Sequence, residues 1–163
     1  MTTKKEAKKR KRAQRKKNKP KRKSPQKRFL DKVKNSNDLP ISHVVVEPEG
    51  QAKMSEIILE FAEPLLDQCE GEKSERTATA LAIMIWNLSL FPEKDQDREI
   101  EKMCSKLLGS NDAKDYAALV DYATFLMERK KKYYSDNKRA IMDYQISGSG
   151  KNRRLDVAST LSP

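Results

Sequence analysis

The sequence has few of the side chains that usually carry catalysis. Its 163 residues include one histidine, His43, which lies beside a predicted strand and lacks partners at the spacing of a catalytic or metal-binding motif. Glycines number only five, and those at 148 and 150 belong to a predicted turn, because no Lys-Ser or Lys-Thr follows in the frame of a phosphate-binding loop. These absences predict that the protein is not an enzyme and uses no cofactor.

Metal ligands and disulfide partners are equally scarce. One predicted helix carries four acids toward one side, namely Glu56, Glu60, Glu63 and Asp67. A metal site in a helical bundle usually adds Glu-x-x-His motifs, which a chain with one histidine cannot supply, so we predict no metal site. The two cysteines, Cys69 and Cys104, lack a C-x-x-C partner and fall on apolar helix faces. Free buried thiols, typical of a reducing intracellular compartment, are therefore favoured over a disulfide.

Long hydrophobic runs are missing as well. The longest apolar stretch, residues 78 to 91, is too short to span a bilayer and is interrupted by Asn87. No apolar signal region follows the basic N-terminal residues before Phe29. We therefore expect a protein without a membrane span that is cytoplasmic, or nuclear if the cell is eukaryotic.

What the sequence has in excess is positive charge, and this charge lies at one end. Up to Lys34 there are 18 lysines and arginines against two acids, a net charge of +16, whereas from Asn35 onward 17 bases face 22 acids, a net charge of −5. The first 28 residues contain no aromatic and no branched aliphatic side chain, so they have little to bury that would offset the entropy cost of ordering. We predict a disordered arm and linker over residues 1 to 37, in which residues 29 to 33 can form a short helical turn, and a globular helical domain over residues 38 to 163.

Within the domain, apolar side chains at the i, i+3, i+4, i+7 spacing predict four helices. They cover residues 54 to 69, 74 to 91, 93 to 108 and 112 to 137. We expect a kink or break at Pro64, a helix end at Gly71 and a cap at Ser74. Residues 78 to 88 are apolar on nearly every side, which predicts a central, buried helix in which Trp86 and Asn87 are core residues.

The C-terminal residues change their hydrophobic period from 3.6 to 2. Residues 140 to 146 and 153 to 160 alternate between apolar and polar, with a turn at 147 to 152, which predicts a β-hairpin. Residues 41 to 46 are a candidate third strand. The predicted fold is mainly α: a compact four-helix domain with a C-terminal β-hairpin, preceded by the basic arm.

The arm is the first candidate binding site. Its cations are spaced by small or polar residues, so they can follow phosphates with little means of reading bases. The candidate residues are Lys8, Lys9, Arg10, Lys11, Arg12, Arg15, Lys16, Lys17, Lys19, Lys21, Arg22 and Lys23. The alternatives are a solvated tail, attraction to anionic lipid, and a nuclear address at residues 8 to 12.

A second basic cluster covers residues 129 to 134, with Lys138 and Arg139 close behind. Here cations alternate with aromatic rings, a combination that can hold phosphate and stack a base. The candidate residues are Lys130, Lys131, Lys132 and Tyr133. The alternative is structural: cations at a helix C-terminus complement the helix dipole, and the tyrosines close the core. Cations at the hairpin turn (Lys151, Arg153 and Arg154) extend this face only if the fold brings them together.

Three segments carry a resemblance: residues 86 to 92, 129 to 139 and 155 to 160. There the chain resembles a group of small uncharacterised bacterial proteins that are mainly helical. The resemblance covers residues 53 to 161, not the arm. It implies a bacterial, cytoplasmic protein and no site residues, because no activity is established for that group.

Two hypotheses of function follow. The first is a non-enzymatic nucleic-acid- or ribosome-associated accessory protein that binds the phosphate backbone through its arm without strong sequence specificity. The second is a helical protein-interaction module whose arm serves solubility or targeting. Nucleic acid or ribosome is the partner in the first hypothesis, and a protein is the partner in the second.

Overall fold

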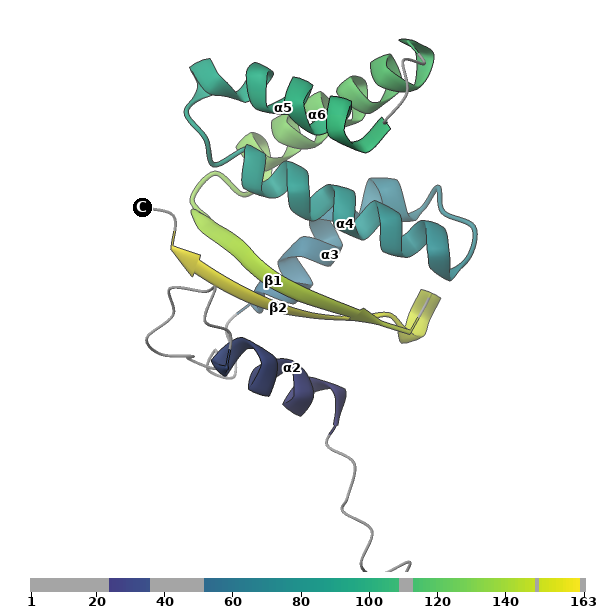
Figure 1. Ribbon diagram of the computed structural model, residues 1–163, viewed down its shortest axis with the longest axis vertical. Helices are drawn as coiled ribbons and strands as arrows, with labels where there is room; N and C mark the ends of the chain where they lie inside the picture. The colour runs from purple at the N-terminus through teal and green to yellow at the C-terminus, as the bar shows by residue number, and fades with distance from the viewer. Residues whose placement is uncertain (1–23, 36–51, 109–112, 149, 162–163) are drawn as a thin grey trace, which may run out of the picture.

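A computed structural model describes residues 24 to 35, 52 to 108, 113 to 148 and 150 to 161. Its elements, in chain order, are α2 (Pro25–Lys34), α3 (Met54–Leu66), α4 (Glu72–Leu88), α5 (Glu93–Leu108), α6 (Ala113–Tyr133), β1 (Arg139–Ser147), the short 3-10 helix η1 (Gly150–Asn152) and β2 (Arg154–Leu161). The mainly helical fold with a C-terminal antiparallel hairpin is confirmed (Figure 1). The described residues form five α-helices rather than four. Among these helices, none is long and apolar enough to cross a membrane.

Helix α4 lies at the centre of the fold. It packs against α3, α5, α6 and β1, and Ala82, Ile85 and Trp86 in its second half are fully buried. The prediction of a central buried helix is confirmed, and the apolar side chains on nearly every face of α4 explain it. The helix ends at Leu88, three residues earlier than predicted, and Pro92 lies in the connection to α5.

The boundaries of α3 and α4 also differ from the prediction. Helix α3 continues through Pro64 but ends at Leu66, so Cys69 lies beyond it. Gly71, with φ of 87°, is the N-cap of α4 rather than the end of the preceding helix. Ser74 was expected to be the cap, but it lies inside the first turn of α4 and its hydroxyl donates back to the carbonyls of Glu70 and Gly71.

The hairpin is fastened to α4 through its own backbone. The side-chain amide of Asn87 donates to the carbonyl of Ile141 (2.9 Å) and its oxygen accepts the amide of Ile141 (2.8 Å). Trp86 Nε1 donates to the carbonyl of Arg139 (2.8 Å). The pairing of β1 with β2 shifts by one residue between Ile141 and Asp143, as in a β-bulge. Helix α4 thus pairs with β1 beside the irregularity in the ladder.

Helix α2 lies within the range predicted as a disordered arm and linker. It is longer than the short helical turn expected at residues 29 to 33, and it corrects the prediction of disorder for residues 25 to 28. Ser24 caps the helix and Pro25 begins it. Phe29 and Val33, four residues apart, are 4% and 3% exposed. A ten-residue helix is marginal alone, but burying two apolar side chains adds about 1.5 to 3 kcal/mol each. In Figure 1, α2 lies on the side of the hairpin away from α3 and α4.

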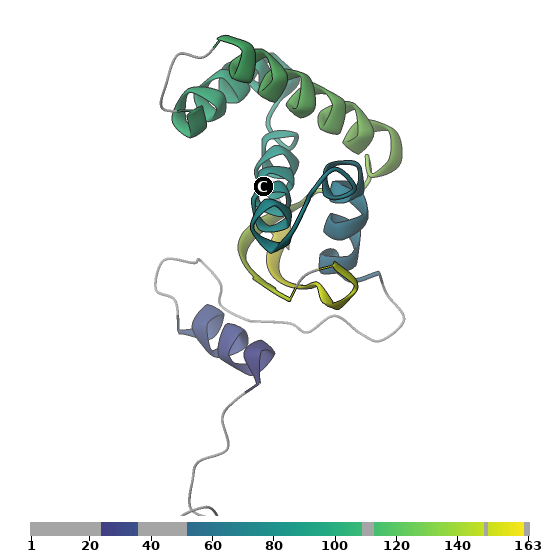
Figure 2. The ribbon, with the colours of Figure 1, turned by 90° about the vertical axis from the view of Figure 1, so that its right-hand side faces the viewer.

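The remaining helices form the end of the molecule opposite α2. Helices α5 and α6 lie side by side there, as Figure 2 shows. Several predictions fall outside the described residues: the arm up to residue 23, the candidate strand at 41 to 46, and His43.

Candidate nucleic-acid interface at the end of α6

The second basic cluster lies in the last turn of α6, as expected, but its four candidate residues divide into two groups. Lys130 is buried, with 4% of its surface exposed. Lys131, Lys132 and Tyr133 are exposed. The direction in which each side chain leaves the helix decides its role, because α6 presents one face to α4 and another to solvent.

Lys130 closes the C-terminus of α6 from inside. Its Nζ donates to the carbonyls of Tyr134 and Asn137, both at 2.8 Å, and lies 4.3 Å from the centre of the Trp86 ring. Removal from water, and next the charge of Lys138, lower the pKa of Lys130 to about 8. Lys130 therefore stabilises the helix end, and it is not on the surface where a phosphate contact was predicted.

Tyr134 belongs to the core as well. Its ring packs edge-on to Phe61 (6.0 Å between centroids) and tilted against Trp86 (5.8 Å). Burial raises the pKa of the Tyr134 hydroxyl, and the charge and hydrogen bond of Glu60 add to the effect. Lys130 and Tyr134 therefore have structural roles: Lys130 closes the helix C-terminus and Tyr134 packs against the core.

Tyr133 has the opposite character, since 59% of its surface is exposed. The guanidinium carbon of Arg129 lies 5.4 Å from the ring centroid and Lys132 Nζ lies 5.0 Å from it. Both distances are within the range of cation–π attraction. The end of α6 thus presents an exposed aromatic ring with two cations close to it.

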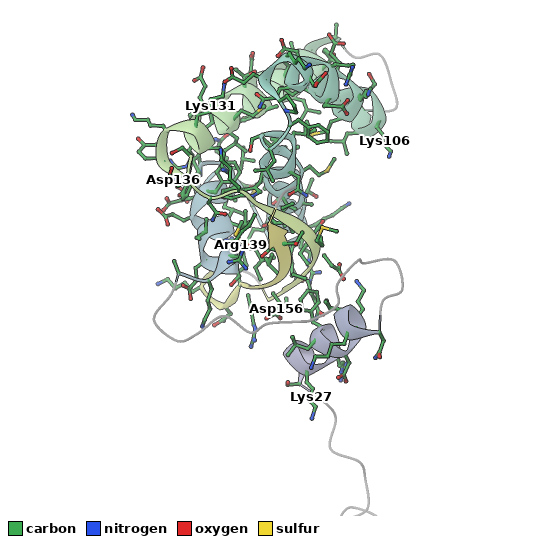
Figure 3. The ribbon with its side chains drawn as sticks, turned by 90° about the vertical axis from the view of Figure 1, so that its left-hand side faces the viewer. Lys27, Lys106, Lys131, Asp136, Arg139 and Asp156 are labelled. Carbon is green, nitrogen blue, oxygen red and sulfur yellow. The ribbon has the colours of Figure 1, made fainter. Side chains whose placement is uncertain are left out.

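Lys131 and Lys132 differ in how firmly they are held. Lys131 Nζ lies 2.8 Å from Glu93 Oε1, and its hydrogen bond and charge hold the pKa of Glu93 below its usual value. Both side chains are more than half exposed, so the pair contributes little to stability and Lys131 can turn to another anion. Figure 3 shows Lys131 near the end of α6, away from Lys27 on α2.

Arg129 links this interface to α3. Its guanidinium donates to the carbonyl of Glu60 (3.2 Å) and lies 3.9 Å from the Glu63 carboxylate. The Arg129 side chain is 21% exposed and its Nε is buried without a hydrogen-bond partner. Arg129 is therefore held against α3 while its guanidinium lies beside the Tyr133 ring. The residues next to Arg129 in the sequence do not indicate this contact with α3.

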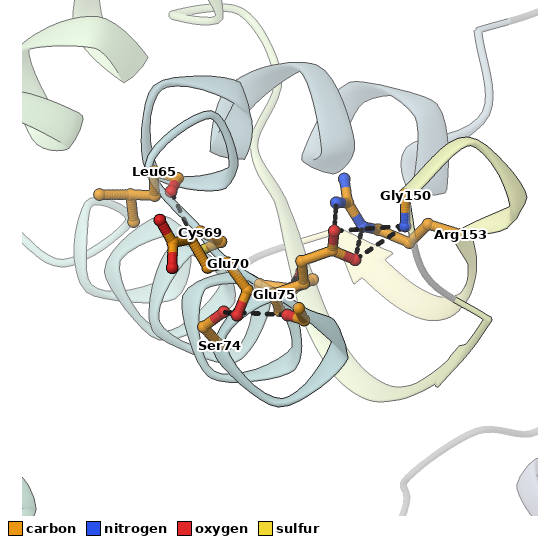
Figure 4. Close-up of polar contacts among 9 residues, drawn as sticks. Leu65, Cys69, Glu70, Ser74, Glu75, Gly150 and Arg153 are labelled. Carbon is orange, nitrogen blue, oxygen red and sulfur yellow. Dashed lines mark hydrogen bonds and ion pairs between the residues drawn. The ribbon is translucent and has the colours of Figure 1, made fainter.

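The cations of the hairpin turn do not extend this face. Arg153 pairs with Glu75 on α4 (2.9 Å), and the Gly150 amide donates to the same carboxylate at 3.0 Å (Figure 4). The Gly150 hydrogen bond, and next Arg153, lower the pKa of Glu75. The turn lies at the end of the hairpin away from α6 (Figure 1), so Lys151 and Arg154 are also remote from Tyr133.

A second surface feature was not predicted because three separate elements build it. A shallow groove of about 650 Å³ is formed by the C-terminal end of α3, the start of α4 and Tyr122 of α6. Apolar lining residues include Leu65, Cys69 and Leu81. Phe125, one turn along α6 from Tyr122, is 49% exposed.

The remaining candidates are resolved as follows. Cys69 and Cys104 are free thiols, as predicted; Cys104 is buried and Cys69 only partly so, and burial raises the pKa of Cys104. Within the described part of the chain, no group of three potential metal ligands comes together. All twelve arm candidates lie outside the described residues, so their contacts stay predictions.

Comparison with known proteins yields no matching family model, no matching curated protein and no matching solved structure. The resemblance to small bacterial proteins therefore stays a prediction.

Proposed function

We propose that the chain is a non-enzymatic accessory protein that binds nucleic acid, alone or within the ribosome. The observation that carries the proposal is the division of charge, +16 up to Lys34 and −5 thereafter. A segment of such density neutralises phosphates and releases their counterions, which gives salt-dependent and sequence-tolerant binding. The acidic balance of the domain leaves the N-terminal segment as the main source of attraction.

Helix α2 supports the proposal because it fixes the root of this segment. Phe29 and Val33 are buried, and Lys32 Nζ lies 2.6 Å from Asp143 of β1. Lys27 and Lys34 are exposed on the same helix. The basic series therefore continues onto an ordered, docked element. A polyanion held by the arm is thereby kept close to the hairpin.

The test compares full-length protein with a variant in which the twelve arm candidates are changed to glutamine. Binding of labelled 20-residue DNA and RNA, single-stranded and duplex, is measured by fluorescence anisotropy between 50 and 300 mM salt. We expect the variant to lose affinity by at least about 100-fold at 50 mM salt and to lose most of its salt dependence.

A scrambled arm of unchanged composition is the matched control. It should retain the affinity of the native sequence, because the attraction depends on charge and not on order. Equal affinity of the native and glutamine arms would contradict the proposal.

The second candidate function, a protein-interaction module, is favoured by the groove between α3, α4 and α6. Its apolar lining and the exposed ring of Tyr122 are what a partner's apolar side chains would contact. Association that survives nuclease treatment, and that is lost in Y122S but kept in the glutamine-arm variant, would favour this function over the first.

A further inference from the structure

We infer that the end of α6 is a base-stacking site for single-stranded nucleic acid, with Tyr133 as its platform. The inference rests on the proposed function and deepens it, because it names the form of nucleic acid that the domain itself selects. It concerns exposed residues of the domain, whereas the proposed function depends on the arm.

The first step is the contrast between two neighbouring rings. Tyr134 packs against Phe61 and Trp86 of the core, whereas Tyr133 is 59% exposed. The centroids of the Tyr133 and Tyr134 rings lie 6.5 Å apart. An aromatic side chain left in water forgoes most of the free energy that its burial would provide. The Tyr133 ring is thus open to a ligand at little cost to the fold.

The second step is the difference between the two cations at this ring. Arg129 is 21% exposed and is fixed by the carbonyl of Glu60 and the carboxylate of Glu63. Lys132 is exposed and has a long, flexible stem. A base that stacks on the Tyr133 face now covered by Lys132 displaces its ammonium group, which then lies close to the phosphate of the same nucleotide.

The third step is the local charge. Lys131 and Lys132 in the same helical turn, and Lys138 five residues after Tyr133, are exposed, and three acids of this region are already engaged. Glu93 is paired with Lys131, and Glu63 lies beside Arg129. Asp136 is hydrogen-bonded by the hydroxyl of Ser135. A phosphate can thus replace Glu93 as the partner of Lys131.

These steps select single strands. In a duplex both faces of each base are stacked within the helix, so a protruding tyrosine has no base to accept, whereas a single strand offers its bases freely. Stacking is tolerant of base identity, because every base has a π face. Arm and platform together then provide two contacts on one flexible chain, which raises overall affinity above that of either alone.

The experiment measures, by fluorescence anisotropy, the binding of the full-length chain to a labelled oligothymidylate of 12 nucleotides and to a labelled 12-base-pair duplex of mixed sequence. Y133A should weaken binding of the single strand by about 10-fold and leave duplex binding within about 2-fold. Y133F, which keeps the ring, should bind like the native protein. F125A removes another exposed ring of α6 and is the matched control; it should change neither affinity.

The outcomes separate the inference from the proposed function. If the native protein binds neither oligonucleotide, both fail. If it binds both and Y133A binds the single strand as well as native, or loses both ligands equally, only the stacking site fails. If F125A loses as much single-strand affinity as Y133A, the stacking site is also overturned. The same holds if Y133A keeps its single-strand affinity but no longer associates with a protein partner. Unchanged thermal melting of Y133A confirms that a loss of binding is not a loss of fold.

Discussion

The guanidinium of Arg129 donates to the carbonyl oxygen of Glu60 at 3.2 Å, and this is the carbonyl that Pro64 cannot bond. In an α-helix the amide of residue 64 would donate to the carbonyl of residue 60, but proline has no amide hydrogen. Helix α6 therefore supplies the donor that the sequence of α3 lacks. The same side chain flanks the exposed Tyr133 ring at 5.4 Å, so fold and candidate interface share one residue.

The pair predicts a coupling between distant substitutions. R129M should lower the free energy of unfolding by about 1 to 3 kcal/mol, because it leaves a helical carbonyl without a donor. In a P64A background, where the backbone amide is restored, R129M should cost about 1 kcal/mol less. Urea denaturation of the four proteins measures the cycle. Strict additivity would show that Arg129 does not replace the missing amide.

Asn87 carries a second specific prediction. Its amide and carbonyl pair with both backbone groups of Ile141 at 2.9 and 2.8 Å. N87A should destabilise the protein by about 2 to 3 kcal/mol, since two backbone groups beside the bulge lose their partners. N87D should be at least as damaging at neutral pH, because a carboxylate cannot donate to the Ile141 carbonyl.

Thermal and urea denaturation provide the measurement for Asn87. Q68A is the control. It removes two exposed hydrogen bonds, from Tyr122 to Gln68 (3.0 Å) and from Gln68 to the carbonyl of Pro64 (2.8 Å), and it should cost less than about 1 kcal/mol. A mild effect of N87A, similar to that of Q68A, would count against this role.

The sequence predicted what depends on local periodicity. The buried helix α4 and the hairpin both follow from spacing of 3.6 or 2 along the chain, and Trp86 and Asn87 were identified as core residues for that reason. The partners of these side chains were not predictable, because Arg139 and Ile141 lie more than 50 residues away. A repeat of 3.6 or 2 residues does not indicate which residues more than 50 positions apart come into contact.

The candidate site shows the same division. Counting cations found the cluster, but separating buried Lys130 from exposed Lys132 requires knowing which face of α6 meets α4. The full length of α2 was missed for a different reason. Phe29 and Val33 indicated only a short helical turn, because residues 25 to 28 have no aromatic or branched aliphatic side chain that would extend the pattern. A signal existed for Arg129, since a proline inside a helix leaves a carbonyl that needs a donor.

Glu75 should govern part of the acid sensitivity of the fold. Its pKa is lowered by the Gly150 amide and by Arg153, so its stabilising contribution is complete above its unfolded pKa, about 4.5, and is lost as the pH falls through its lower folded value. E75Q should therefore be less stable than native at pH 7, and the difference should shrink as the pH falls below about 4.5.

Urea midpoints at several pH values test the prediction for Glu75. E56Q, which alters a carboxylate that is 65% exposed, should follow the native curve more closely. A constant difference between E75Q and native across the acid range would contradict the role of Glu75 in clamping the hairpin turn.

Lys130 predicts a second rise of stability with pH, on the alkaline side. Its pKa is about 8 in the fold and close to 10.5 when the chain unfolds, so between these values the unfolded state binds more protons. The free energy of unfolding therefore gains a positive slope with pH across this window. K130M lacks that slope. It also loses the hydrogen bonds to Tyr134 and Asn137 at every pH, which shifts its curve without changing the slope.

The measurement is urea denaturation of native, K130M and K132M proteins at pH 7, 8, 9 and 10. The native protein should gain about 2 kcal/mol relative to K130M from pH 7 to pH 10. K132M, which removes an exposed amine of the same helical turn, should parallel the native curve. If K130M also parallels it, Lys130 keeps its proton in the fold, and the burial of its ammonium group against Trp86 costs less than its position implies.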